Sequence, residues 1–118
     1  MYNLKVEGNF SAAHNLRGYK GKCEDLHGHN WRIELVVRSE SLDNLGMVLD
    51  FKFLKKKLNN FLEKLDHKYL NKLEYFKKTN PTSENLAKYI FQQLKPQISD
   101  LSSITVWENP TSAATYEE

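Results

Sequence analysis

The alternation of apolar and polar residues from His27 to Arg38 constrains the fold of this chain more than any other feature. Successive side chains of a β-strand point to opposite faces, so this pattern predicts a long strand with one buried face. Residues 2–10 alternate in the same way, and we expect them to pair with 27–38 across a loop at 15–26. The apolar positions of the two strands are Tyr2, Leu4, Val6, Phe10, Trp31, Ile33, Leu35 and Val37.

Two segments with helical spacing follow the two strands. Asp50 is a typical N-cap residue, and Thr82 or Ser83 can cap the second helix. We place Asp66-His67 at the end of the first helix, with a polar stretch from there to Asn80-Pro81. The apolar stripes are Phe51, Leu54, Leu58, Phe61, Leu62 and Leu65 in the first helix, and Leu86, Ala87, Ile90, Phe91 and Leu94 in the second, which Pro96 ends.

Alternation returns at 104–108, and a further strand is expected at 112–117. The order strand-strand-helix-helix-strand-strand is an α+β pattern, which we interpret as one domain spanning residues 1–118. The expected architecture is a four-stranded antiparallel sheet with two helices on one face. Its other face and its edges need cover, and self-association is one physical answer.

Charge and cysteine content exclude several classes of function. The chain has 17 basic and 15 acidic residues, a balance that does not favour nucleic acid or membrane binding. No segment approaches the run of about 20 apolar residues needed to span a membrane. The single cysteine and the lack of a signal-peptide pattern lead us to expect a cytoplasmic protein.

Three of the four histidines form a candidate metal site. His27 and His29 are two residues apart on a predicted strand, so both rings point to the buried face. His14 has the parity of the buried face of the first strand, and the loop returns the chain to bring it near the other two. Three imidazoles with one open position are typical of catalytic zinc, although nickel, iron and copper also accept such ligands. Carboxylates are expected to orient the rings.

Four other residues are candidates for chemistry. Cys23 lies among charged residues in the loop, where a thiol near a metal ion and lysines has a lowered pKa and can act as base or nucleophile. Asp66 beside His67 can complete a proton relay with it. Glu108 has the inward parity of its strand, so it needs either a ligand with a planar N–H pair or an ion pair with Arg32 or a lysine.

Five motifs in order resemble the 6-pyruvoyl-tetrahydropterin synthase superfamily over nearly the whole chain. They are residues 10–14, residues 23–29 (Cys-Glu-Asp-Leu-His-Gly-His), residues 65–67, residues 80–84 (Asn-Pro-Thr-Ser-Glu) and Trp107-Glu108. The resemblance implies the tunnelling fold, with subunits assembled as trimers or hexamers. It also implies a metal site of His14, His27 and His29 binding Zn²⁺, catalytic residues Cys23, Asp66 and His67, and substrate-binding residues Glu108, Thr82 and Ser83.

The spacing between Cys23 and His27 looks like that of the 6-carboxy-5,6,7,8-tetrahydropterin synthases of queuosine biosynthesis. The implied reaction converts 7,8-dihydroneopterin triphosphate to 6-carboxytetrahydropterin, acetaldehyde and triphosphate. The alternatives are a pyruvoyl-forming synthase acting on the same substrate and a non-catalytic zinc- or pterin-binding protein. The implied partners are the small pterin substrate and further copies of the chain.

Overall fold

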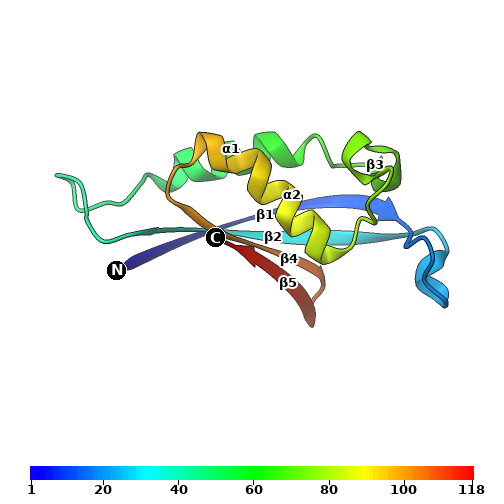
Figure 1. The fold of residues 1–118 in the computed structure, drawn as a ribbon. Helices are drawn as coiled ribbons and strands as arrows, with labels where there is room; N and C mark the ends of the chain where they lie inside the picture. The colour runs from blue at the N-terminus through cyan, green and yellow to red at the C-terminus, as the bar shows by residue number, and fades with distance from the viewer.

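The computed structural model describes the backbone of all 118 residues and every side chain except that of Cys23. Two α-helices cover one face of a twisted, elongated sheet, as Figure 1 shows, which confirms the α+β class. The strands are β1 (Tyr2–His14), β2 (His27–Ser39), β3 (Lys68–Tyr69), β4 (Leu101–Asn109) and β5 (Ser112–Glu117), and the helices are α1 (Phe51–Leu62) and α2 (Ser83–Leu94). Short 3-10 turns lie at Lys22–Glu24, Leu70–Lys72, Glu74–Phe76 and Lys95–Gln97.

The sheet has the strand order β3-β1-β2-β4-β5. The four predicted strands are neighbours and antiparallel, and β1 pairs with β2 along its whole length, from Tyr2 opposite Ser39 to His14 opposite His27. The expected number of strands was wrong, because β3 adds a fifth strand that runs parallel to β1. A strand of two residues is too short to show any periodicity in the sequence.

The core lies between the helices and one face of the sheet. The predicted inward positions of β2 are completely buried, from Trp31 to Val37, and both helices bury the stripes expected of them except at Phe51. Phe51, the first residue of α1, is 54% exposed. Neither α-helix exceeds 12 residues, and within the described part of the chain none has the length and apolarity to cross a membrane.

The segment between the helices differs from the sequence prediction. The first helix ends at Leu62 rather than at Asp66-His67, and both of these residues lie in the turn that follows it. The stretch expected to be polar contains β3 and two 3-10 turns, which bury Leu70 and Phe76 in the core. His67 adopts a positive φ of 58° immediately before β3, which pairs with β1.

Candidate metal centre

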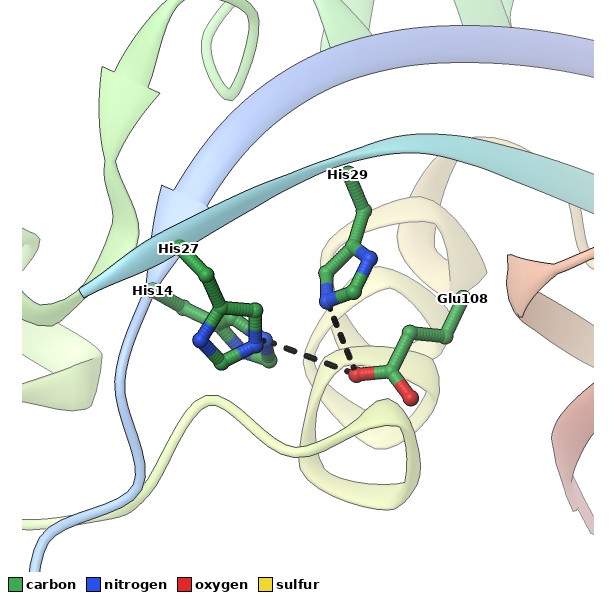
Figure 2. A group of neighbouring side chains, drawn as sticks. All are labelled: His14, His27, His29 and Glu108. Carbon is green, nitrogen blue, oxygen red and sulfur yellow. Dashed lines mark hydrogen bonds and ion pairs between the residues drawn. The ribbon is translucent and has the colours of Figure 1, made fainter. Parts of the chain in front are cut away.

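Three imidazoles and one carboxylate converge at the end of the β1–β2 pair, as Figure 2 shows. His14 is the last residue of β1, and its Cα lies opposite that of His27, the first residue of β2. His29 is one full pleat further along β2, so its ring lies on the same face, and Glu108 comes from β4. One ligand atom from each of the four residues lies within 4.8 Å of all the others. This group could hold a metal ion.

Backbone carbonyl groups orient two of the rings. His14 Nδ1 donates to the Pro81 carbonyl oxygen at 2.7 Å, and His27 Nδ1 donates to the Asp25 carbonyl oxygen at 2.8 Å. The expectation that carboxylates orient these two rings was therefore wrong. A ring whose Nδ1 carries the proton turns an unprotonated Nε2 toward its neighbours when it is neutral. Both partners are backbone carbonyl groups, which every residue carries, so neither contact could be predicted from the residue types in the sequence.

The electrostatics of the cluster favour a bound cation. Burial lowers the pKa of His14 below its ordinary value, and the neighbouring His27 and His29 lower it further, although the Pro81 hydrogen bond and Glu108 act in the opposite direction. Burial likewise lowers the pKa of His29, against the effect of Glu108. Neutral imidazoles present lone pairs rather than charges, so the contacts of His14 and His29 with Glu108 are not ion pairs near neutral pH.

The distances between the ligand atoms fit a small metal ion. His14 Nε2 lies 2.9 Å from His27 Nε2, and Glu108 Oε1 lies 3.4 Å from His14 Nε2 and 3.3 Å from His29 Nε2. Two ligands on a tetrahedral zinc ion are roughly 3.3 Å apart, given zinc–nitrogen bonds of about 2.0–2.1 Å. His29 Nε2 is buried with no hydrogen-bond partner. A buried ring nitrogen without a hydrogen bond is costly, and a metal ion bound by the converging lone pairs would remove that cost.

Glu108 is the residue whose placement the sequence only partly anticipated. Its side chain points to the buried face of the sheet, as predicted, and reaches the histidine cluster. However, 31% of the side chain stays exposed. Arg32, the ion-pair partner considered from the sequence, instead contacts Glu7 and Glu34 on the opposite face of the sheet. The carboxylate therefore stands beside the metal site, where it can serve as a fourth ligand or contact a molecule bound there.

Asp66 and His67 form a pair beside β1, just before the edge strand β3. Asp66 Oδ1 accepts from the Ser11 backbone N–H at 2.9 Å, and Asp66 Oδ2 lies 3.0 Å from His67 Nδ1. The Ser11 hydrogen bond, with smaller contributions from His67, lowers the pKa of Asp66. The His67 side chain is 83% exposed. It lines a surface hollow of about 540 Å³ together with His29.

The remaining predicted residues fall into two groups. Thr82 is the N-cap of α2, and its hydroxyl oxygen accepts from the Asn85 backbone N–H, while Ser83 begins the helix. Thr82 directly follows Pro81, whose carbonyl contacts His14. Cys23 lies in the 3-10 turn Lys22–Glu24, and its side chain is outside the described part of the structure.

Comparison with known proteins identifies the family. The model of the 6-pyruvoyl tetrahydropterin synthase family matches residues 3–118. The chain belongs to this family. A 6-carboxy-5,6,7,8-tetrahydropterin synthase from Synechocystis is 40% identical, with 98% of this chain and 93% of that protein covered. A protein of the same name from Haemophilus influenzae is 32% identical, and each chain is covered completely.

Solved structures place the fold in the same family. A 6-pyruvoyl tetrahydropterin synthase from Caenorhabditis elegans superposes with a TM-score of 0.90 at 36% identity, covering 99% of this chain and 95% of that one. A relative named as a carboxy-forming synthase and one named as a pyruvoyl-forming synthase thus have nearly the same sequence identity to this chain, 40% and 36%.

Proposed function

We propose that this protein converts 7,8-dihydroneopterin triphosphate to 6-carboxy-5,6,7,8-tetrahydropterin, releasing acetaldehyde and triphosphate and consuming one water molecule. The observation that carries the proposal is the convergence of His14, His27 and His29, whose ligand atoms lie within 4.8 Å of one another and of a Glu108 oxygen, with backbone carbonyls holding the first two rings at Nδ1. The resemblance of Cys23 and its three-residue spacing to the carboxy-forming enzymes supports this product over the alternatives. The reaction needs no redox cofactor, because the ring is reduced as the side chain is oxidised.

In this proposal Zn²⁺ is held by His14, His27 and His29, where a bound dication acidifies hydroxyl groups of a substrate side chain. Cys23 and His67 move protons on and off the side-chain carbons, and Asp66 holds His67 in the orientation that its 3.0 Å contact defines. Glu108 accepts two hydrogen bonds from the amino-pyrimidine edge of the pterin, and Thr82 and Ser83 contribute to the same pocket.

We further propose that the protein acts as a homo-oligomer in the queuosine pathway. The sheet ends at β3 on one side and β5 on the other, and self-association would cover both edges. His67 is mostly exposed in the single chain. A neighbouring subunit that closes the hollow beside it would exclude water from the proton-transfer groups. The triad of Cys23, Asp66 and His67 would then draw residues from two subunits.

The test is incubation of the zinc-loaded protein with 7,8-dihydroneopterin triphosphate, followed by mass spectrometry of the pterin and an assay for acetaldehyde. The proposal expects carboxytetrahydropterin and acetaldehyde in equal amounts. A pyruvoyl product without acetaldehyde would assign the pyruvoyl-forming activity, which the C. elegans structure favours by its similarity. Unchanged substrate would indicate a binding protein. Cys23→Ala is the matched variant, expected to keep its zinc and lose turnover.

A further inference from the structure

Two asparagine side chains pair with the chain just after β1 ends. Asn71 Oδ1 accepts from the Asn15 backbone N–H at 3.0 Å, and Asn71 Nδ2 donates to the Asn15 carbonyl at 2.9 Å. Asn80 makes the same two contacts with Arg17, both at 3.0 Å. Each carboxamide therefore supplies the donor and the acceptor that a neighbouring strand would offer to an extended chain. The two bridges tie this chain to the segment between α1 and α2.

The Asn80 bridge lies directly beside the contact that orients His14. Asn80 precedes Pro81, whose carbonyl oxygen accepts from His14 Nδ1 at 2.7 Å. The carbonyl of Asn80 accepts from Asn85 Nδ2 at 2.9 Å, which ties the same residue to α2. Asn80 is thus fixed on one side by the helix and on the other by the end of β1. Its position determines where the Pro81 carbonyl points.

The His14 ring depends on that carbonyl because the ring is almost completely buried. Its exposed fraction is 1%, so water has little access to replace a lost hydrogen-bond partner at Nδ1. A neutral imidazole that loses its Nδ1 acceptor can carry its proton on Nε2 instead. A proton on Nε2 would point at His27 Nε2, 2.9 Å away, and block the metal site.

We propose that Asn80 is a positioning residue of the metal centre. By bridging the peptide of Arg17 it holds the Pro81 carbonyl against His14 and selects the Nδ1–H tautomer, which leaves Nε2 free to bind a metal. This inference rests on the metal-dependent function proposed above. Loss of a group that orients a metal ligand typically weakens metal binding by about 10- to 100-fold, and that range is expected here.

The test compares Asn80→Ala with Arg17→Ala. The Arg17 guanidinium donates to the carbonyls of Phe76 and Thr79, so Arg17→Ala removes two hydrogen bonds to the same segment but leaves the Asn80 bridge intact. Long-range ¹H–¹⁵N NMR of the metal-free proteins reports the His14 tautomer, and competition with a chelator reports zinc affinity. Asn80→Ala should show mixed tautomers and zinc binding weakened by about 10- to 100-fold. Arg17→Ala should keep one tautomer and most of its affinity.

Two results would overturn the role of Asn80: an unchanged tautomer and affinity in Asn80→Ala, or equal losses in Arg17→Ala. If Asn80→Ala does not fold, Asn80→Asp keeps the acceptor for the Arg17 N–H and puts a carboxylate oxygen in place of the donor to the Arg17 carbonyl. It should shift the tautomer in the same direction, and no shift would refute the proposal. A wild-type protein that binds no zinc would refute the metal-dependent function, while the tautomers would still decide the role of Asn80.

Discussion

Gly8 of β1 packs against α1 without room for a side chain, and replacing it with alanine should destabilise the fold. A Cβ atom at this position would lie 2.8 Å from Leu62 Cδ1, 2.9 Å from Asn59 Oδ1 and 3.2 Å from Leu58 Cδ2. Favourable carbon contacts are about 3.5–4.0 Å long, so the helix or its side chains must retreat by roughly 0.5 Å or more. Leu58 and Leu62 are buried, which limits their freedom to move away.

The magnitude follows from two opposing contributions. Overpacking a well-filled core costs about 1–3 kcal/mol. Alanine recovers about 0.5–1 kcal/mol relative to glycine within a strand, because the unfolded chain loses freedom. Taking the middle of each range, Gly8→Ala should therefore lower the free energy of unfolding by about 1 kcal/mol.

Gly28→Ala is the matched control on the paired strand. A Cβ atom at Gly28 would contact only the Ala12 carbonyl oxygen at 3.7 Å, an ordinary distance. This variant should be neutral or more stable by up to about 1 kcal/mol. Urea denaturation of both variants with a chelator present measures the difference without a contribution from bound metal. A Gly8→Ala protein as stable as wild type would show that the close approach of α1 to β1 is not a constraint.

Three further predictions concern the site. His27→Ala should weaken zinc binding by more than about 100-fold and abolish turnover, because it removes a ligand rather than a supporting group. Chelator competition measures the zinc affinity and an activity assay measures the turnover. Turnover by the metal-free variant would contradict this prediction. Glu108→Gln should raise KM by about 10- to 100-fold through loss of charge-assisted hydrogen bonds to the pterin, whereas a loss of zinc affinity with unchanged KM would identify Glu108 as a ligand. Asp66 has a lowered pKa in the folded protein, so its contribution to stability is present above its ordinary pKa of about 3.9 and is lost as the pH falls through the lower folded value. Asp66→Asn should flatten the loss of stability in that acid range, measured by thermal unfolding against pH, and an unchanged profile would show that the Ser11 contact does not stabilise the carboxylate.

Elements that repeat a pattern could be predicted from the order of residues. Strand parity placed His14, His27 and His29 on one face, because the alternation of side chains continues unbroken through both strands. The N-cap roles of Asp50 and Thr82 followed from local chemistry, since each side chain accepts from a backbone N–H two or three residues ahead. These features depend on neighbours in the chain and can be recognised before the chain folds.

Contacts between residues distant in sequence became visible in the folded chain. The Pro81 carbonyl that orients His14 lies 67 positions away from it, and the Asn80 bridge joins segments 63 positions apart. Glu108 reaches the histidines because β4 pairs with β2. Backbone carbonyls are identical at every residue and strand registers are set by packing, so no residue type announces such contacts. The ligands could be recognised from their side chains, whereas their orientation required the fold.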